Sequence, residues 1–187
     1  MKRAAFFDRD GTLIEDRGYM SRAEQVALVT CAPEALKALR RNNFKIVVIS
    51  NQSGIGRGLI TAAQADAVTA EMIRLLEKHD AAVDAVYYCP HTPGDGCECR
   101  KPKPGMLLRA ARDLGIELKA SFMVGDKPSD CEAGQLVGCR PIYLRHGNRP
   151  EKVPANTIVV SNLTEVLDAI LNAGAPDGTQ TSERQKS

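Results

Sequence analysis

Two aspartates separated by a single residue follow the first apolar run of the chain. The run 4–7 ends at Asp8, and Asp10 comes two positions later. Residues i and i+2 of an extended segment point the same way, so both carboxylates should face one site. One carboxylate can then attack as a nucleophile while the other exchanges a proton. The spacing therefore favours covalent catalysis with acid–base assistance; for this pair alone, a turn that only caps a helix is the alternative.

Polar residues also follow two later apolar runs. The β-branched run 45–49 ends at Ser50. The run 121–124 is followed by Gly-Asp, with the carboxylate at Asp126. Ligands of open α/β sheets bind at the carboxyl ends of the strands, so adjacent strands would bring these groups to one place. Clustered carboxylates repel one another without a cation, and Mg²⁺ prefers oxygen ligands. We therefore expect a Mg²⁺ site made of Asp8, Asp126 and the main-chain carbonyl of Asp10, with Lys127 beside it.

A short loop holds three cysteines and one histidine in the arrangement C-x-H-x5-C-x-C. Three thiolates and an imidazole suit tetrahedral Zn²⁺. Because protein groups fill all four positions, the site should be structural rather than catalytic. A redox pair or an incidental loop is the alternative. The expected zinc ligands are Cys89, His91, Cys97 and Cys99. The remaining cysteines, Cys31, Cys131 and Cys139, are expected to be small core residues.

The segments between these groups alternate between strand and helix patterns. Strands are expected at 4–7, 45–49, 83–88, 121–124, 141–144 and 157–160, and helices at 33–41, 61–78, 106–114, 129–137 and 163–172. This alternation indicates an α/β fold with a parallel sheet covered by helices on both faces. We expect one domain over 1–173 and a polar, disordered tail over 174–187.

Composition excludes several classes of protein. The chain has 187 residues, 25 Lys plus Arg and 23 Asp plus Glu, which is too balanced for a bulk nucleic-acid binder. It contains no run of 18 apolar residues, so no membrane span is expected. Only four apolar residues precede Asp8, too few for an export signal, and a cytoplasmic protein is expected. Nothing in the sequence demands more than a monomer.

The motifs together resemble those of haloacid-dehalogenase-superfamily phosphatases. Residues 8–12, DRDGT, resemble the first motif, DxDGT, and Ser50 after its strand resembles the second. Lys101 resembles the third, and residues 125–126 resemble the fourth. All four occur in the expected order over about residues 1–144. The resemblance implies a Rossmann-like sheet, and no insertion between the motifs is large enough for a cap domain, so it implies a capless enzyme.

The resemblance also implies a chemistry. Asp8 would attack phosphorus and form an aspartyl-phosphate, while Asp10 would protonate the leaving oxygen and then deprotonate the attacking water. Mg²⁺ would bridge Asp8, Asp126 and a phosphoryl oxygen. Dehalogenases of the superfamily lack the second aspartate, so Asp10 argues for phosphoryl transfer. The groups that would hold the other phosphoryl oxygens are Ser50, Arg100 and Lys101.

The cysteine loop narrows the resemblance to two groups. Its CPH…CxCRKP pattern resembles the heptose 1,7-bisphosphate phosphatases and the histidinol-phosphate phosphatase domain. The five-residue gap between His91 and Cys97 favours the histidinol group. The stretches 16–19, 51–58, 103–106 and 123–127 favour the heptose group, and we weigh them above the loop length. The resemblance then implies removal of the C7 phosphate and retention of the C1 phosphate. The implied substrate contacts are Asp16, Arg17, Gly18, Tyr19, Ser50, Asn51, Gln52, Ser53, Arg100 and Lys101.

Three other interpretations stay open at this point. The enzyme alternatives are a histidinol-phosphate phosphatase and a phosphomutase, although a phosphomutase would need a cap to exclude water. The third is an inactive, zinc-stabilised binding protein, against which both Asp8 and Asp10 argue. The zinc loop runs directly into Arg100 and Lys101, so folding around a metal would hold these two cations over the phosphate.

Overall fold

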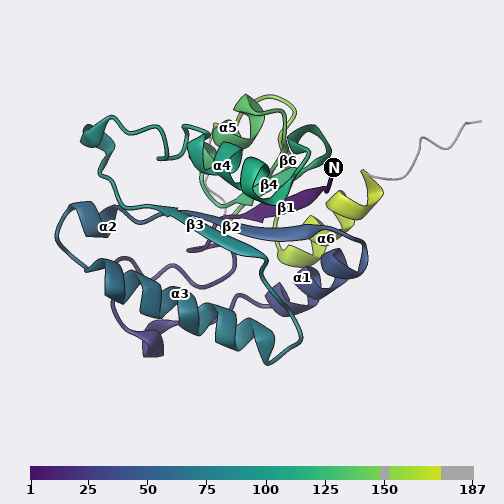
Figure 1. Cartoon of the computed structure of the whole chain (residues 1–187). Coiled ribbons are helices and arrows are strands. Elements are labelled where there is room, and N and C mark those ends of the chain that lie inside the picture. The colour runs from purple at the N-terminus through teal and green to yellow at the C-terminus, as the bar shows by residue number, and fades with distance from the viewer. Residues whose placement is uncertain (148–151, 174–187) are drawn as a thin grey trace, which may run out of the picture.

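A six-stranded parallel sheet runs through the middle of the protein (Figure 1). The computed structural model describes residues 1–147 and 152–173. The strand order is β3-β2-β1-β4-β5-β6, and every neighbouring pair is parallel. This order places β1 between β2 and β4, so the strands that precede the three polar motifs are neighbours. The strands are β1 (Ala4–Phe7), β2 (Lys45–Asn51), β3 (Ala85–Cys89), β4 (Phe122–Gly125), β5 (Arg140–Leu144) and β6 (Ile158–Val160).

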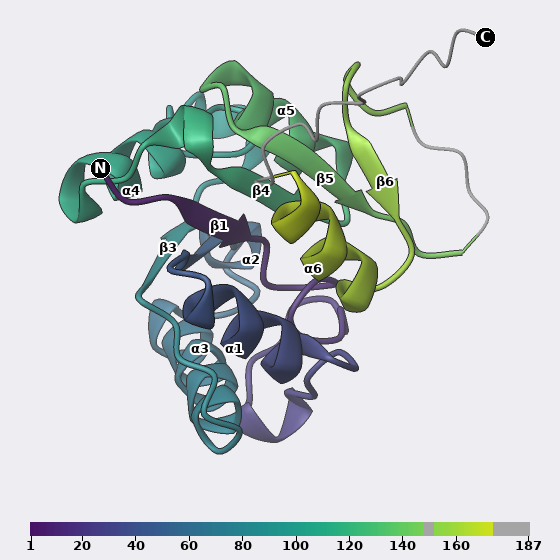
Figure 2. The ribbon, with the colours of Figure 1, turned by 90° about the vertical axis from the view of Figure 1, so that its right-hand side faces the viewer.

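Helices cover both faces of the sheet, as the alternating pattern predicts. In Figure 1, α1, α3 and α6 lie below the sheet, and α4 and α5 lie above it. Figure 2 shows α1 and α6 side by side on the same face. The helices are α1 (Ala32–Arg41), α2 (Ser53–Gly56), α3 (Ala62–Glu77), α4 (Gly105–Leu114), α5 (Pro128–Leu136) and α6 (Leu163–Asn172). Three short 3-10 turns complete the described elements: Ala23–Gln25, Pro93–Asp95 and Leu118–Ala120.

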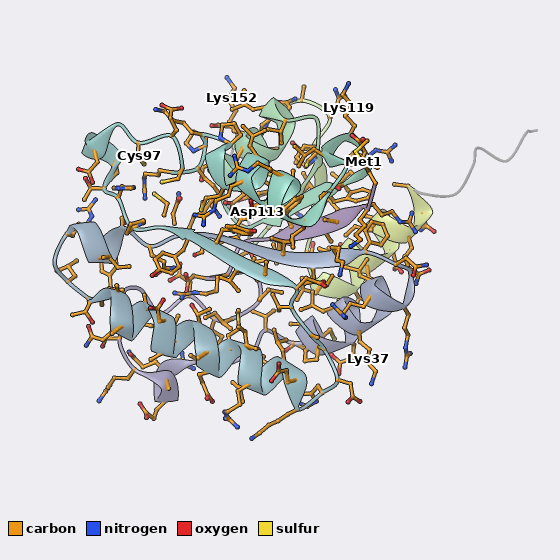
Figure 3. All side chains as sticks on the ribbon, viewed as in Figure 1. Met1, Lys37, Cys97, Asp113, Lys119 and Lys152 are labelled. Atoms are coloured by element: carbon orange, nitrogen blue, oxygen red, sulfur yellow. The ribbon has the colours of Figure 1, made fainter. Side chains whose placement is uncertain are left out.

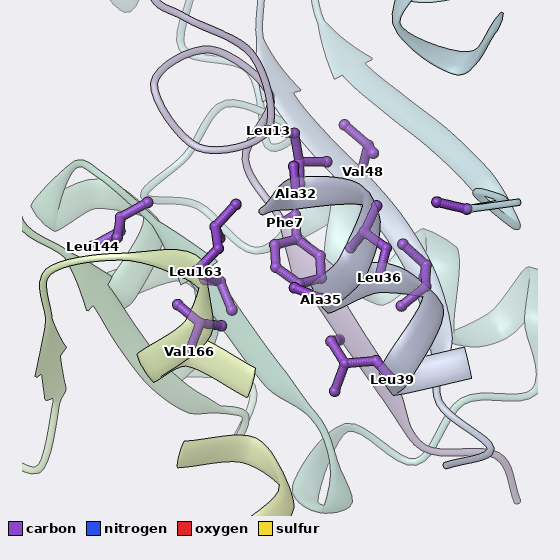
Figure 4. Close-up of a cluster of buried hydrophobic side chains, with 14 of the residues drawn as sticks. Phe7, Leu13, Ala32, Ala35, Leu36, Leu39, Val48, Leu144, Leu163 and Val166 are labelled. Carbon is purple, nitrogen blue, oxygen red and sulfur yellow. The ribbon is translucent and has the colours of Figure 1, made fainter. Parts of the chain in front are cut away.

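The strands bury both of their faces, which divides the core in two. Phe7 and Val48 pack with α1, α3 and α6, and Figure 4 shows this cluster around Phe7, Leu36 and Val166. Phe6 and its neighbours face the other way and pack with α4. Successive residues of a strand point to opposite faces, so the run Ala4–Phe7 serves both clusters and is wholly buried. Burial on both faces explains why β1 is continuously apolar up to Asp8.

The expected elements are present, with small shifts at their ends. Thr61 caps α3: its hydroxyl accepts from the N–H of Gln64 at 3.1 Å, and the Gln64 side chain accepts from the N–H of Thr61 at 2.8 Å. The strand expected at 83–88 begins at Ala85 instead. Residues 53–56, between β2 and α3, form the short helix α2.

One expected core residue lies outside the core. Cys31 is exposed, and its φ of +65° places it in the left-handed region directly before α1. The helix begins at the next residue, so Cys31 lies at the helix end rather than on its buried face. Cys131 and Cys139 are buried, as expected. Residues 174–187, for which the sequence predicts a disordered tail, lie outside the described residues.

The connections between the motifs are short. Between β1 and β2 the chain forms only a 3-10 turn and α1, and between β2 and β3 it forms α2 and α3. No folded insertion stands over the carboxyl ends of the strands within residues 1–147, which agrees with the expected capless architecture. None of the described helices has the length and apolar character needed to cross a membrane.

Candidate active site

Asp8 lies at the centre of the sheet and is paired with a buried lysine. Its main-chain N–H donates to the carbonyl of Val124 on β4 at 2.9 Å, which continues the strand pairing to the aspartate itself. Its Oδ1 lies 2.7 Å from Nζ of Lys101. The same ammonium lies 2.7 Å from Oδ1 of Asp130 and donates to the carbonyl of Ile49 at 2.6 Å. The side chains of Asp8, Lys101 and Asp130 are each no more than 5% exposed. One buried cation is therefore shared between two carboxylates.

A third carboxylate completes this cluster. Ligand oxygens of Asp8, Asp126 and Asp130 all lie within 4.8 Å of one another. Oδ1 of Asp126 is buried and has no hydrogen-bond partner among the described residues. A Cβ on Gly11, whose φ is +82°, would collide with the Asp126 carboxylate, and one on Gly125 would collide with that of Asp130. Glycine at both positions therefore lets the carboxylates approach the ends of β1 and β4.

Asp10 lies in a separate hydrogen-bond network. The guanidinium of Arg9 donates from Nε and Nη2 to the Asp10 carboxylate at 3.0–3.2 Å. The amide of Gln52 donates to Oδ2 of Asp10 at 2.7 Å and to the hydroxyl of Ser50 at 2.8 Å. The Ser50 hydroxyl lies 3.5 Å from the same oxygen of Asp10. The second motif therefore reaches the first through Gln52 as well as through Ser50.

The two carboxylates of the first motif have different surroundings. Burial raises the pKa of Asp10 above its ordinary value, and the neighbouring Asp8 carboxylate adds to this, while Arg9 acts in the opposite direction. A raised pKa suits a group that must deliver a proton near neutral pH. Burial also raises the pKa of Asp126 to about 7, with Asp8 and Asp130 adding like-charge repulsion. A bound cation would relieve that repulsion.

Residues 100 and 101 are held by the second motif and by the cysteine loop. The Asn51 side chain donates to the carbonyl of Lys101 at 3.1 Å and accepts from its N–H at 3.0 Å. Arg100 donates from Nη1 to the carbonyl of His91 at 3.2 Å. Lys103, one of the spare cations near the site, pairs with Glu98 at 2.7 Å. Lys101 therefore points into the carboxylate cluster, while Arg100 and Lys103 are bonded to the cysteine loop.

The loop after the first motif spans two parts of the site. Nζ of Lys127 lies 3.4 Å from Oδ2 of Asp16, and the carboxylates of Asp126, Asp8 and Asp16 raise the pKa of Lys127 against the opposing effect of its burial. The half-exposed ring of Tyr19 lies against Gly54 of α2, where a Cβ would strike it. This loop thus contacts the elements of both the fourth and the second motifs. The neighbouring Arg17 pairs with Glu15 at 2.6 Å, and Ser53 begins α2.

The four candidate zinc ligands converge at the end of β3 and in the loop that follows it, where Cys97 is labelled in Figure 3. Sγ of Cys99 lies 3.1 Å from Sγ of Cys89 and 3.5 Å from that of Cys97. Nδ1 of His91 lies 3.3 Å from Sγ of Cys99 and 3.5 Å from Sγ of Cys89. Tetrahedral ligands at about 2.3 Å from a zinc ion are about 3.7 Å apart, close to these separations. The donor set and its spacing therefore fit zinc.

Three residues near the site were not found by sequence reasoning. Asp130 is the third residue of α5, and its Oδ2 accepts from the N–H of Lys127 at 3.0 Å, as in a helix cap. That local role hides the contact of its other oxygen with Lys101. Arg9 separates the two aspartates and carries no motif of its own. His146 lies in the loop after β5, and its Nε2 is 2.6 Å from the carbonyl of Gly11. Of these three residues, only Asp130 has a recognisable sequence feature, because it is an acidic residue in the first turn of a helix.

Comparison with known proteins agrees with this geometry. A family model for HAD-hydrolase-like proteins matches residues 98–166. A D-glycero-beta-D-manno-heptose-1,7-bisphosphate 7-phosphatase of Pasteurella multocida is 45% identical over 156 residues, covering 80% of this chain and 85% of that protein. The enzyme of the same name from Escherichia coli (strain K12) is 38% identical over 184 residues, covering 92% of this chain and 96% of that one.

A solved structure is similar over nearly the whole chain. It is D,D-heptose 1,7-bisphosphate phosphatase from B. bronchiseptica complexed with magnesium and phosphate. Its TM-score is 0.84 at 32% identity, covering 92% of this chain and 99% of that one. Taken with the site geometry, these relatives identify the family: the chain belongs to the haloacid-dehalogenase-like phosphatases, enzymes that hydrolyse phosphoric monoesters.

Proposed function

We propose that this chain removes the C7 phosphate of D-glycero-D-manno-heptose 1,7-bisphosphate and leaves the 1-phosphate. The reaction proceeds through an aspartyl-phosphate on Asp8 and depends on Mg²⁺. It supplies a precursor of nucleotide-activated heptose for the lipopolysaccharide core. Relatives at 38% and 45% identity carry the name of this activity, and the names specify the β anomer. We therefore propose the β anomer as the preferred substrate.

The observation that carries the proposal is the meeting of the motifs at the carboxyl ends of β1, β2 and β4. Asp8 lies against Lys101, while Asp10 lies against Gln52 and Ser50. A nucleophile, a proton donor and phosphate-binding groups are thereby brought to one end of the sheet. This is the arrangement that phosphoryl transfer through a covalent intermediate requires.

The carboxylate cluster fits a magnesium ion. Asp8 and Asp126 would hold it together with the main-chain carbonyl of Asp10, and Asp130 lies close enough to contribute an oxygen or to orient a bound water. The partnerless buried oxygen of Asp126 supports this assignment, because a buried polar atom without a partner is unfavourable. Lys127 stands beside the site as a second source of positive charge. When bound, Mg²⁺ neutralises charge on the transferring phosphoryl group.

Asp8 is the residue that attacks phosphorus. Lys101 holds the carboxylate in place through its contact with Oδ1. The ammonium also carries positive charge to the phosphoryl oxygens, and Ser50 and Arg100 act as further donors to them. As the Asp8–phosphorus bond forms, the bond from phosphorus to the C7 oxygen breaks.

Asp10 delivers a proton to the departing C7 oxygen and later removes one from the water that attacks the aspartyl-phosphate. Each proton taken up in the second step restores the acid for the next cycle. The raised pKa of its buried carboxyl favours the protonated form that the first step needs. Hydrolysis of the intermediate breaks the bond between Asp8 and phosphorus and releases inorganic phosphate.

A sugar bisphosphate needs groups that hold its other end. We propose that residues 16–19 and 50–53 contact the sugar, with Arg100 and Lys101 on the transferred phosphate. Within these stretches, Asn51 and Gln52 already bond to Lys101 and Asp10, so they also fix the catalytic groups. The exposed Arg57 and the exposed end of Lys127 are candidates for the C1 phosphate. Lys103 is not, because Glu98 holds it.

We propose that Cys89, His91, Cys97 and Cys99 hold a structural zinc ion. The bond from Arg100 to the carbonyl of His91 supports a role for this loop in placing the phosphate-binding residues. We further propose a single domain over residues 1–173 that acts in the cytoplasm as a monomer. Its partner is the small-molecule substrate, with no role in binding nucleic acid or membranes.

The test is phosphate release with Mg²⁺ from heptose 1,7-bisphosphate and from histidinol phosphate. We expect kcat/KM to be at least about a hundredfold higher for the heptose, and higher for its β than its α anomer. The short gap between His91 and Cys97 is the feature that favours histidinol phosphate. A preference for histidinol phosphate would overturn the proposed substrate. Absence of phosphate release from either compound by folded, metal-loaded protein would favour an inactive binding protein.

A further inference from the structure

Arg9 is a buried cation that no step of the proposed reaction uses. Its side chain is 3% exposed. Nε lies 3.2 Å from Oδ1 and 3.1 Å from Oδ2 of Asp10, and Nη2 lies 3.0 Å from each of these oxygens. Donors from two nitrogens of a planar guanidinium restrict the plane of a carboxylate as well as its position. Arg9 therefore limits the rotation of the Asp10 side chain.

The other end of the guanidinium is anchored on α3. Nη1 of Arg9 donates to Oγ1 of Thr69 at 3.1 Å. The Thr69 hydroxyl donates in turn to the carbonyl of Ala65 at 2.9 Å, which fixes its orientation. On the same helix, Val68 and Met72 are fully buried in the core beneath the sheet. Arg9 thus connects the Asp10 carboxylate to a helix that is itself fixed by packing.

Gln52 reaches the same carboxylate from the loop after β2, at 2.7 Å from Oδ2. The side chain of Asp10 nevertheless remains 13% exposed, whereas that of Asp8 is 5% exposed. Asp10 is therefore held by two elements while part of it stays open. This is the arrangement expected of a proton donor that must meet a substrate atom in a defined position.

We propose that Arg9 is a positioning residue for proton transfer by Asp10. Its anchor on Thr69 keeps the Asp10 carboxyl within reach of the leaving oxygen. This inference rests on the proposed role of Asp10 as general acid, but not on the identity of the sugar. A displacement of a reacting group by about 1 Å can lower a rate about a hundredfold. Loss of Arg9 should therefore weaken the step in which the leaving oxygen is protonated.

The experiment compares two kinds of phosphate ester in Arg9→Gln and Arg9→Lys. One is 4-nitrophenyl phosphate, whose leaving group departs without a proton. The other is the best alkyl phosphate found for the wild-type enzyme, whose leaving oxygen needs one. Because kcat/KM reports the steps up to transfer to Asp8, it isolates the acid step from later hydrolysis. We expect Arg9→Gln to lower kcat/KM for the alkyl ester about 30- to 100-fold and for the aryl ester no more than about threefold.

Two variants test the anchor and the fold. Thr69→Val removes the acceptor on α3, and we expect the same selective loss, smaller at about three- to tenfold. Arg74→Gln removes an arginine–carboxylate pair within α3, between Arg74 and Glu71, on the surface of the protein. That control should leave both esters unchanged. Arg9→Lys keeps a buried cation but lacks the planar pair of donors, so it should recover only part of the alkyl activity.

Asp10→Asn separates the failure of this inference from failure of the proposed mechanism. If Asp10→Asn loses alkyl activity selectively while Arg9→Gln loses both activities by one factor, Arg9 is only structural and the inference is wrong. If Asp10→Asn itself shows no selectivity, the proposed acid role of Asp10 fails. Should Arg9→Gln not fold, selective loss in Arg9→Lys and Thr69→Val still supports the inference, and equal loss on both esters contradicts it.

Discussion

At the scale of single residues, the two carboxylates of the first motif differ in the side chains that surround them. Asp8 faces a buried ammonium, that of Lys101, whereas Asp10 faces Arg9 and Gln52 and stays more exposed. Both carboxylates face a cation, but burial raises the pKa of Asp10 in spite of Arg9, and a raised pKa suits proton transfer. Lys101 instead holds the Asp8 carboxylate in place for nucleophilic attack. The environments, not the residue type, therefore assign the two proposed roles.

The nucleophile is tested by Asp8→Asn. The amide has nearly the same shape but is a much weaker nucleophile, so we expect kcat to fall by at least about 10⁴-fold. The substitution removes one negative charge from a cluster of three carboxylates and one lysine, and the fold should persist. Phosphate release and circular dichroism check the two expectations. Turnover near the wild-type rate would mean that another group attacks phosphorus.

At the scale of elements, the two ends of the sheet differ. The loops at the carboxyl ends of the strands carry the candidate site, and at the opposite end side-chain bonds connect neighbouring elements. Asp84, just before β3, accepts from the N–H of Ile46 at 2.8 Å and pairs with Lys45 at 2.6 Å and Arg40 at 2.8 Å. This joins β3, β2 and α1 far from the carboxylates. At the other end, the cysteine loop orders the chain between β3 and Lys101. The Asp84 contacts and the cysteine loop can each be tested by substitutions that leave Asp8 unchanged.

Cys97→Ser should lower zinc content and stability together. Serine is a poor zinc ligand, so the remaining three groups would hold the ion weakly. We expect bound zinc to fall below one equivalent per chain and Tm to fall by roughly 4–8 °C, equivalent to about 2 kcal/mol. Metal analysis and thermal unfolding measure both. The matched control is Cys31→Ser, at an exposed cysteine outside the cluster. Unchanged zinc content in Cys97→Ser would show that Cys97 is not a zinc ligand.

Asp84 makes stability depend on pH in a predictable direction. Burial opposes ionisation of its carboxyl, but the bonds from Lys45 and the N–H of Ile46, with Arg40 nearby, lower its pKa below the ordinary value. A lowered pKa stabilises the fold above about pH 4, and this stabilisation is lost as the pH falls through the folded-state pKa. Asp84→Asn should lower Tm at pH 7 by roughly 3–6 °C, about 1.5 kcal/mol.

Thermal unfolding from pH 7 to pH 3 provides the check. The difference in Tm between wild type and Asp84→Asn should narrow below about pH 4, because the wild-type carboxylate then gains its proton. A difference that stays constant with pH would show that the substitution acts through packing rather than charge.

At the scale of the whole molecule, the candidate site lies between β1 and β4, where successive strands change from one side of β1 to the other. The chain places β2 and β3 on one side of β1, and β4, β5 and β6 on the other. Connections therefore leave β1 and β4 in opposite directions and open a crevice between their carboxyl ends. Asp8 and Asp126 follow these two strands. The described elements that build the crevice and both cores lie within residues 1–147 and 152–173.

We therefore expect a chain ending at Ala173 to keep its activity. Within the part of the chain that the structure describes, residues up to 173 form both hydrophobic clusters, and the proposed site residues lie between positions 8 and 127. Removal of 174–187 should change Tm by less than about 2 °C and kcat/KM by less than about twofold. A large loss of either would show that this segment contributes to the fold or to the site.

The sequence by itself predicted the order of elements, and it predicted that the aspartates after β1 and β4 and the four residues of the cysteine loop would each form a cluster. These depend on local patterns: an apolar run that ends at Asp8, alternating strand and helix patterns, and cysteines close together in one loop. Strand periodicity and ligand spacing are properties of a few neighbouring residues. They can be read without knowing where the rest of the chain lies.

Only the tertiary structure decided which side chains meet across the sheet. Asp130 has the local pattern of a helix cap, yet its second oxygen contacts Lys101, 29 positions earlier in the sequence. Arg9 has no sequence pattern of its own, and the role that we propose for it depends on Asp10 and on Thr69, 60 residues away. Such contacts arise from the order and twist of the strands and the packing of the helices, which bring distant residues together. Their geometry, rather than any local spacing, supports the proposed roles of Asp8 as nucleophile and Asp10 as proton donor.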